Sequence, residues 1–146
     1  MRVVFQRVKK ARVTVGDRVV AEIGAGAVLL VGIRRDDTSK DVEFLARKCL
    51  GLRVFEDGEG KMNLSVSDIH GDLLAVSQFT LYGDTRKGRR PSFTDAAPPG
   101  KAHQLYEEFV SVLRTSGLRI QKGSFGELML VEIHNDGPVT LIIDSR

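Results

Sequence analysis

The feature that most constrains the fold is a proline set between two strand-like runs near the end of the chain. The first run, Met129–His134, alternates apolar and polar side chains, which predicts a strand with one buried face. The second run, Val139–Ile143, is β-branched and almost entirely apolar, which predicts a strand buried on both faces. The tetrapeptide Asn135-Asp136-Gly137-Pro138 separates them. We therefore expect two strands with a break at this tetrapeptide.

The Gly137-Pro138 step admits two interpretations. Proline has no N–H to donate to a sheet, so it interrupts strand pairing. The bond before a proline prefers the trans form by only about 0.5–1 kcal/mol, so a cis bond is accessible. The simpler interpretation is a tight turn that joins two strands. The other is a sharp backbone bend that directs carbonyl groups outward for recognition.

Size and composition limit the class of protein. A chain of 146 residues predicts one domain over residues 1–146, large enough to bury a core without a covalent staple. The single cysteine, Cys49, allows no internal disulfide, and its place on an apolar helical stripe indicates a core residue. The longest apolar run, residues 25–33, is too short to span a bilayer. With 22 basic and 19 acidic residues, the net charge of +3 permits a polyanionic partner without requiring one.

The remaining pattern predicts an α+β fold. Helices are expected from Thr38, where a capping box begins, to Gly51, and from Pro98-Pro99-Gly100 to Gly117. About eight short strands are expected over residues 1–8, 12–15, 18–21, 27–33, 52–56, 73–81, 118–121 and 128–143. This order favours a mostly antiparallel, barrel-like sheet with two or three helices packed on it.

Catalytic candidates are few. The three histidines, His70, His103 and His134, and the single cysteine show no triad or metal-ligand spacing, so no metal or cofactor is expected. What remains is the run Ser77-Gln78-Phe79-Thr80-Leu81, a polar intrusion at the end of an apolar strand. If the strand continues, Gln78 and Thr80 share one face and Ser77 and Phe79 the other. The run is either a polar strand end or a site that aims N–H groups and short side chains at a carbonyl oxygen.

A basic loop follows this run. The segment Thr85-Arg86-Lys87-Gly88-Arg89-Arg90 is the densest positive patch in the chain. It is either a solvated loop or a flexible segment that holds phosphates next to the candidate site. Phe93, which follows, is expected in the core rather than stacked on a base.

Three stretches together resemble one protein family. They are residues 77–91 (SQFTLYGDTRKGRRP), residues 135–140 (NDGPVT), and residues 53–63, which contain RVFED and GKMN. With these motifs the chain resembles the D-aminoacyl-tRNA deacylases, and the likeness runs essentially from end to end. The first two motifs are long and specific, so chance agreement of both is remote.

The resemblance implies a cytoplasmic homodimer, with no membrane segment, that hydrolyses the ester between a D-amino acid, or glycine, and the 3′ end of tRNA. Glycine mischarged on tRNA(Ala) is among the implied substrates. In such enzymes a cis Gly-Pro pair enters the partner's site, which carries over here to Gly137 and Pro138 facing the partner's Ser77–Leu81 segment. The rigid backbone excludes an L side chain by collision, and glycine has no side chain to exclude.

The resemblance also assigns roles within the site. Family members position a water and use the 2′-hydroxyl of the terminal adenosine, with Ser77, Gln78, Phe79 and Thr80 as the catalytic segment. Thr80 is either a nucleophile or a positioning group that acts with Gln78 and with N–H groups near Phe79 and Thr80. Binding of tRNA is expected from six side chains: Arg86, Lys87, Arg89, Arg90, Phe125 and Met129.

One residue departs from the family pattern, and two other functions stay open. The usual Phe-Gly-Ala-x-Met reads Phe125-Gly126-Glu127-Leu128-Met129 here, which puts a carboxylate where the adenosine wall is expected. Such a carboxylate would repel phosphate or crowd the base. The alternatives to a deacylase are a non-catalytic nucleic-acid-binding module that uses the basic loop and a small-molecule esterase on the same scaffold.

Overall fold

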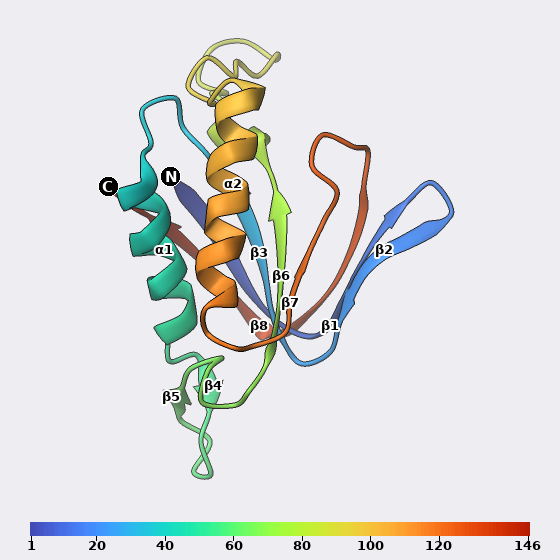
Figure 1. Ribbon diagram of the computed structural model, residues 1–146, viewed down its shortest axis with the longest axis vertical. Coiled ribbons are helices and arrows are strands. Elements are labelled where there is room, and N and C mark those ends of the chain that lie inside the picture. Colours follow the sequence, from blue (N-terminus) through green and yellow to red (C-terminus); the bar gives the residue numbers. More distant parts are fainter.

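The computed structural model describes residues 1–146 as a curved sheet with two helices on one side of it (Figure 1). A short 3-10 helix, η1, follows the sixth strand. In chain order the elements are β1 (Arg2–Val15), β2 (Arg18–Ile23), β3 (Gly26–Gly32), α1 (Ser39–Gly51), β4 (Phe55–Glu56), β5 (Met62–Leu64), β6 (Asp72–Ser77), η1 (Phe79–Tyr82), α2 (Pro99–Arg114), β7 (Ile120–Lys122) and β8 (Leu130–Asp144).

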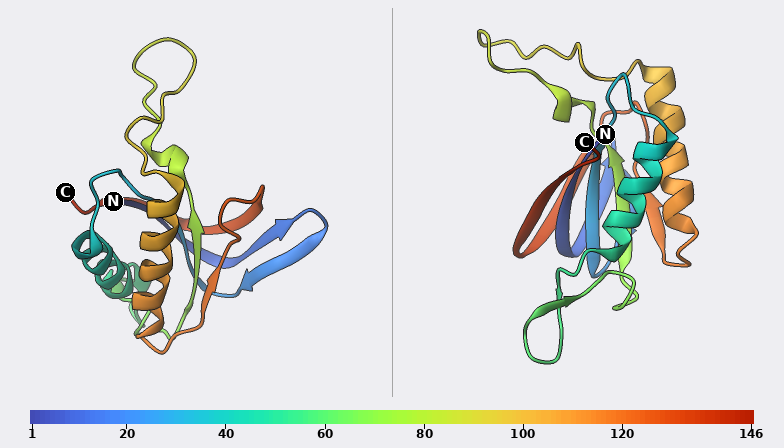
Figure 2. Two further views of the ribbon diagram at one scale, coloured as in Figure 1. Left: turned by 45° about the horizontal axis from the view of Figure 1, so that its top comes forward. Right: turned by 90° about the vertical axis from the view of Figure 1, so that its left-hand side faces the viewer.

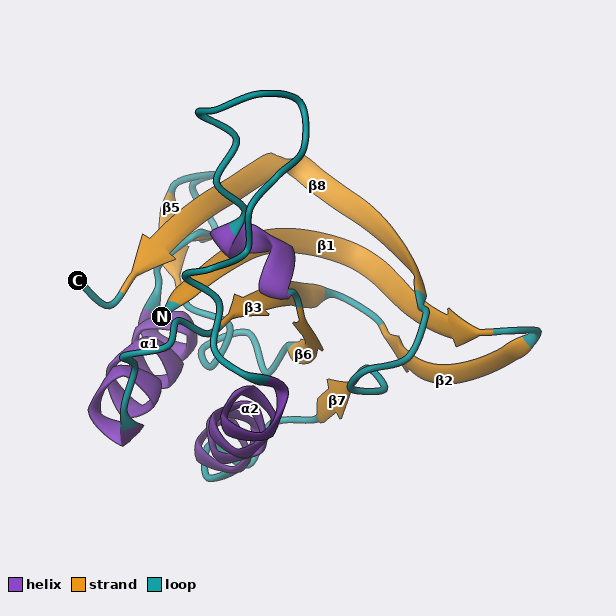
Figure 3. Cartoon of the chain, turned by 90° about the horizontal axis from the view of Figure 1, so that it is seen from above, coloured by secondary structure: helices purple, strands orange, loops and turns teal.

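The main sheet is mixed, and β1 is its central strand. Six strands form it in the order β2-β1-β3-β6-β7, with β8 also paired to β1. Pairs of β1 with β2, β3 and β8 are antiparallel, whereas β3–β6 and β6–β7 are parallel. The sheet curls into a nearly closed, barrel-like shape (Figure 3). The expected α+β class is confirmed, but two of the five pairings differ from the antiparallel arrangement. They are parallel because helices or long connections separate these strands in sequence.

Both helices occur where the sequence predicts them. The N–H of Thr38 donates to the Asp41 carboxylate at 2.8 Å, which forms the expected capping box of α1. Cys49 is fully buried on the inner face of α1, and burial raises the pKa of its thiol to about 12. The helix α2 starts with Pro99 and packs Phe109 and five other side chains into the core. Because α1 and α2 pack against each other, both cover the same side of the sheet.

The expected pair of strands around Gly137-Pro138 is wrong, because β8 is one strand of 15 residues. It pairs with β1 on both sides of the proline, from Thr14↔Leu130 to Arg2↔Asp144. Between the pairs Gln6↔Thr140 and Val8↔Asn135, four residues of β8 face one residue of β1. The proline therefore sits in a bulge, here called the bend of β8 (residues 136–139), and not in a turn that reverses the chain.

The second half of β8 is exposed on its outer side, which corrects the expectation of burial on both faces. Leu141 is 37% exposed and Ile142 is 69% exposed. No other strand pairs with the outer edge of β8. Figure 2 shows β8 on the side of the sheet farthest from the helices. The apolar run thus covers an open edge of the sheet, a location that hydrophobicity alone does not distinguish from a buried strand.

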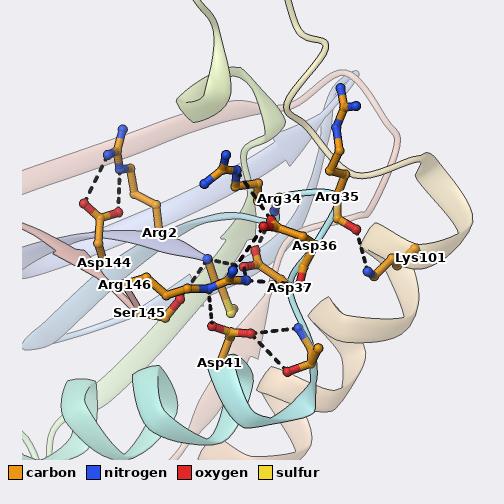
Figure 4. A network of polar contacts seen from close by, with 12 residues as sticks. Arg2, Arg34, Arg35, Asp36, Asp37, Asp41, Lys101, Asp144, Ser145 and Arg146 are labelled. Atoms are coloured by element: carbon orange, nitrogen blue, oxygen red, sulfur yellow. Dashed lines mark hydrogen bonds and ion pairs between the residues drawn. The ribbon is translucent and has the colours of Figure 1, made fainter.

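Ionic contacts fasten the end of β8 to the start of α1 (Figure 4). Arg2 holds Asp144 through two hydrogen bonds of 2.8 and 3.1 Å. The Arg146 guanidinium reaches Asp36, Asp37 and Asp41 at 3.0–3.2 Å. No helix combines the length and the apolar character that crossing a bilayer requires. No group of three or more His, Cys, Asp or Glu side chains is clustered so that it could hold a metal ion.

Candidate functional site

The polar run after β6 forms a 3-10 helix instead of extending the strand. β6 ends at Ser77, and η1 covers Phe79–Tyr82. The expected strand over residues 73–81, and with it the alternation of faces, is therefore wrong beyond Ser77. Gly32 of β3 explains why the chain can turn here: a Cβ on Gly32 would lie 3.0 Å from Leu81 Cβ and 3.3 Å from Gln78 O. The missing side chain lets η1 pack directly on the sheet.

Gln78 and Thr80 are brought together by this turn. The Gln78 side-chain amide donates to the Thr80 hydroxyl, although the two residues do not share a strand face. Ser77 and Gln78 are half-buried, whereas Phe79 and Thr80 are exposed. The N–H groups of Phe79 and Thr80 lie in the first turn of η1, where no preceding carbonyl of the helix can accept from them. The segment thus offers donors and a hydroxyl, without a strong acid or base beside them.

An apolar pocket of about 750 Å³ opens next to this segment. Five of the predicted site residues line it: Ser77, Gln78, Phe79, Phe125 and Met129. Thr80 adjoins it through Gln78. The volume is in the range of small-molecule and cofactor sites, about 300–1,000 Å³. The other lining residues are Val76, Phe93, Ala96, Ala97, Pro98, Pro99, Ala102, Gly126, Glu127, Leu128 and Val131.

Aromatic rings form two walls of the apolar pocket. Phe125 stacks on His103 of α2 with ring centroids 4.6 Å apart. The Tyr106 ring is tilted relative to Phe125, with the two centroids 5.8 Å apart. On the other side, Phe79 meets Phe93 edge to face at 5.1 Å. Phe93 is 38% exposed and lines the pocket, so its expected place in the core is wrong. Its only signal in the sequence is that of an aromatic residue near a polar loop.

The loop that carries Phe125 and Met129 is fixed by short-range contacts. The N–H of Ser124 approaches Met129 Sδ at 3.3 Å. The Ser124 hydroxyl donates to the Glu127 carboxylate. Glu127 therefore stands at the pocket, where the sequence departs from its family, but a neighbouring hydroxyl already occupies one of its oxygens.

Gly137 and Pro138 do not line the apolar pocket of their own chain. Both residues are exposed, and the peptide bond between them is cis. The bend of β8 lies at the opposite end of the molecule from η1 (Figures 1 and 2). Within one chain, the structure thus separates the two halves of the predicted site.

Arg7 holds the bend of β8, and the sequence reasoning did not find it. Its side chain is only 9% exposed. Its Nη1 donates to Val54 O at 2.8 Å, and its Nε donates to Asp136 O at 3.2 Å. A Cβ on Gly137 would lie 2.9 Å from Arg7 Nη2, so the guanidinium lies directly against the glycine. The available signal was an arginine on the inward face of an alternating strand, after Val3 and Phe5.

Asn135 replaces the strand hydrogen bonds that the bend interrupts. Its Nδ2 donates to Arg7 O at 2.9 Å and to Val139 O at 3.0 Å, which spans the bulge. Its Oδ1 accepts from the Thr140 hydroxyl at 3.0 Å. The bend is therefore held by polar contacts from two side chains, Arg7 and Asn135.

The basic loop projects from the sheet beyond η1 (Figure 2). Arg86 makes a two-pronged contact to the Asp84 carboxylate at 2.9 and 2.7 Å, and this contact lowers the pKa of Asp84 to about 2. Lys87, Arg89 and Arg90 are exposed, and no carboxylate lies within 4 Å of their charges. Three cations of the loop are thus free to meet a polyanion, and one is largely neutralised.

Comparisons with known proteins give a consistent result. The family model described as D-Tyr-tRNA(Tyr) deacylase matches residues 4–144. A protein of Desulfatibacillum aliphaticivorans named D-aminoacyl-tRNA deacylase is 56% identical over 146 residues, and the match covers 100% of both chains.

Two solved structures extend the likeness. One, titled c-Myc DNA Unwinding Element Binding Protein, has a TM-score of 0.94 and 45% identity and covers 100% of this chain and 99% of its own. Another, titled as the structural analysis of a probable eukaryotic D-amino acid tRNA deacylase, has a TM-score of 0.85 at 21% identity. That match covers 98% of each chain and shows the shared fold.

Proposed function

The chain belongs to the D-Tyr-tRNA(Tyr) deacylase family, whose relatives are hydrolases of ester bonds, and we propose how its site recognises and cleaves D-aminoacyl-tRNA. Its substrate class is aminoacyl-tRNA, as the family implies. We take residues 1–146 to act as one deacylase domain. The observation that carries the proposal is the apolar pocket, which joins the Ser77–Thr80 segment to the Phe125–Met129 loop.

The apolar pocket receives the terminal adenosine of the tRNA. Phe79, Phe93 and Phe125 supply ring faces or edges on which a base can stack, a contact worth about 1–3 kcal/mol per base. The ester then lies at Ser77–Thr80, which forms the pocket's polar end. The three unpaired cations of the basic loop, Lys87, Arg89 and Arg90, together with Arg86, attract the phosphates of the same strand.

Hydrolysis proceeds by positioning rather than by a side-chain triad. An aminoacyl ester is already activated, so modest stabilisation of the developing oxyanion is sufficient. The N–H groups of Phe79 and Thr80 and the Gln78 amide are the donors that meet this charge. Thr80 orients the attacking water or the substrate's own 2′-hydroxyl. It has no neighbouring base to make it a nucleophile, since its hydroxyl accepts from Gln78.

Selection of the D form requires a second copy of the chain. The bend of β8 lies away from its own pocket, whereas β8 offers an open edge with exposed Leu130, Leu141 and Ile142. A long edge strand with exposed apolar side chains is the kind of surface that a partner covers. In the dimer, Gly137 and Pro138 of one copy face Ser77–Thr80 of the other. Their main chain blocks an L side chain and leaves a D side chain or glycine unhindered.

The main test compares rates on D-tyrosyl-tRNA and L-tyrosyl-tRNA. We expect cleavage of the D ester and of glycyl-tRNA(Ala), and no cleavage of the L ester. Thr80→Ala should lower the rate on every substrate, whereas Pro138→Ala should raise the rate on the L ester. Equal cleavage of both mirror forms by the unmodified protein would contradict the filter. Unchanged activity in both variants would show that the site is elsewhere.

Mixed dimers test whether the filter acts across the interface. When Thr80→Ala subunits are exchanged into Pro138→Ala protein, one site of each mixed dimer has an intact Thr80 facing an intact partner Pro138. Its preference for the D ester should therefore return. If the filter served its own chain, each site would keep one lesion and the preference would stay low. Light scattering on the same samples measures whether the chain is a dimer.

A second candidate function is nucleic-acid binding without catalysis. It is favoured by the free cations of the basic loop and by the 45% identity to the protein titled as a DNA unwinding element binding protein. It predicts salt-dependent binding to uncharged RNA or DNA and no ester turnover. Cleavage of D-amino-acid methyl esters as fast as tRNA esters would instead favour a small-molecule esterase.

A further inference from the structure

The third family-like stretch, residues 53–63, has no role in the site described so far. It forms the β4–β5 hairpin, which lies at the opposite end of the molecule from η1 and the basic loop (Figure 1). Neither strand contributes to the apolar pocket. Figures 1 and 2 place the hairpin at the same end as the bend of β8, and Arg7 contacts both Val54 and Asp136. The hairpin is therefore placed to support that bend.

A polar hub fixes the shape of the β4–β5 hairpin. The Asp57 carboxylate accepts hydrogen bonds from the N–H groups of Glu59 at 2.8 Å and Lys61 at 3.0 Å, and from Asn63 Nδ2 at 2.8 Å. These bonds lower the pKa of Asp57, and the bond from the Asn63 side chain contributes most to the lowering. Asn63 is therefore the side chain that ties the turn to β5.

Asn63 also connects the hub to Arg53. Arg53 Nε donates to Asn63 O at 2.8 Å, and its Nη2 donates to Asn63 Oδ1 at 3.1 Å. Both ends of the Asn63 amide are thus used, one by Asp57 and the other by Arg53. The paired contact fixes the backbone just before Val54 relative to β5.

Val54 is linked to the bend of β8 by the side chain of Arg7. The Val54 side chain is buried in the core, and its carbonyl accepts from Arg7 Nη1 at 2.8 Å in a buried contact. The same guanidinium donates to Asp136 O and lies against Gly137. The path from Asn63 to the backbone next to Pro138 therefore has three steps. Hydrogen bonds join Asn63 to Arg53, the covalent chain joins Arg53 to Val54, and Arg7 donates to both Val54 O and Asp136 O.

We propose that Asn63 and Arg53 are positioning residues for the Gly137-Pro138 filter, and that the β4–β5 hairpin is its support. The inference rests on the proposed role of that filter. Neither side chain touches the substrate. They keep the Val54 carbonyl where it holds the Arg7 guanidinium, and a looser guanidinium lets Asp136 and Gly137 move. Because exclusion by collision depends on position, this movement admits the L ester.

The test is the ratio of D to L cleavage in Asn63→Ala. We expect the rate on L-tyrosyl-tRNA to rise by about three- to tenfold, the scale of one or two hydrogen bonds, with the D rate within about twofold. Lys61→Ala is the matched control, because Lys61 enters the hub through its backbone, which the substitution keeps, and its side chain pairs only with the exposed Glu59. A purely structural role would lower the active fraction and reduce both rates together, leaving the ratio unchanged. An unchanged ratio in Asn63→Ala overturns the inference.

A double-mutant cycle with Arg7→Ala tests the route. If Asn63 acts through Arg7, adding Asn63→Ala to Arg7→Ala produces no further decrease in selectivity. Additive decreases would overturn the proposed path. The unmodified protein separates this inference from the proposed function: if it does not distinguish D from L esters, the filter itself fails. If it distinguishes them and Asn63→Ala does so equally well, only the role of the hairpin fails.

Discussion

The two halves of the proposed site are built in different ways. The apolar pocket is made by packing: β6, α2 and the Phe125–Met129 loop enclose it, and the rings within each of its two aromatic walls contact one another. The bend of β8 is exposed, and two polar side chains, Arg7 and Asn135, hold it in place. The stability of a packed region is spread over many small contacts, whereas the stability of the bend depends on a few hydrogen bonds.

This difference predicts separable effects of substitutions. A change in the pocket alters binding and turnover of every ester alike, because all substrates share the nucleoside and the reacting carbonyl. A change at the bend alters the selection of mirror forms and leaves turnover of the D ester nearly intact. The ratio of D to L rates is therefore the quantity that distinguishes the two regions.

The largest effect on this ratio is expected from Arg7→Ala. The substitution leaves Val54 O and Asp136 O without their charged donor and opens space beside Gly137. Hydrogen bonds to charged groups are worth about 1.5–3 kcal/mol, so selectivity should fall by roughly 10- to 150-fold. Single-turnover rates on paired D and L esters measure it. A parallel fall of both rates, at constant ratio, would place Arg7 in general stability instead.

For the pocket, Gly32→Ala in β3, beneath the η1 segment, should give the converse result. The added Cβ would meet Leu81 Cβ at 3.0 Å and Gln78 O at 3.3 Å, so η1 must shift away from β3. Overpacking of this kind costs about 1–3 kcal/mol, and the shift displaces Gln78 and Thr80 from the ester. We expect the D rate to fall about tenfold or more with no gain on the L ester. Gly51→Ala at the end of α1, where an added Cβ meets nothing within 4 Å, is the control.

The sequence predicts these two regions unequally well. Both helices follow from capping and apolar spacing, because these signals are local: Thr38 with Asp41, and Pro99 at the start of α2. A sharp bend at Gly137-Pro138 is one of the two interpretations of the sequence, but the continuation of β8 through it as one strand is not predicted, because a proline in a bulge and a proline in a turn have the same local sequence. The role of Arg7 depends on Val54 and Asp136, which lie 47 and 129 residues away in the chain. The candidate run 77–80 stands out as a polar end to an apolar strand, whereas the roles proposed for residues 77–80, 125 and 129 rest on family resemblance.

Asn135→Ala gives a smaller test of the bend. The variant lacks the amide that spans the bulge to Arg7 O and Val139 O and leaves the Arg7 guanidinium in place. Selectivity should therefore fall by about three- to tenfold, less than in Arg7→Ala, since each neutral hydrogen bond is worth about 0.5–1.5 kcal/mol. Thr140→Val keeps the Asn135 amide that spans the bulge and removes the hydroxyl contacts to Asn135 Oδ1 and Gln6, so it should change the ratio less again. A larger decrease in Asn135→Ala than in Arg7→Ala would reverse the order of importance.

The smallest effects are expected in the basic loop, where two neighbouring cations can be compared. Lys87 has no carboxylate partner, whereas Arg86 is paired with Asp84. When a substitution removes a cation that contacts a phosphate, the slope of the logarithm of the tRNA-binding constant against the logarithm of the salt concentration becomes shallower by about one unit. Lys87→Gln should therefore reduce this slope more than Arg86→Gln, because the charge of Arg86 is already balanced by Asp84.

The pH dependence of the loop sharpens this last comparison. The Arg86 contact lowers the pKa of Asp84 to about 2, so the carboxylate stays ionised until the pH falls toward that value. The unmodified protein and Lys87→Gln both keep Arg86, so the difference in binding between them should be the same at pH 5 and at pH 8. Lys87→Gln and Arg86→Gln should both keep the full D-to-L ratio, because the loop meets phosphates that mirror-image esters share. A change of the ratio in Lys87→Gln would connect the loop to the filter and remove the separation between binding and selection.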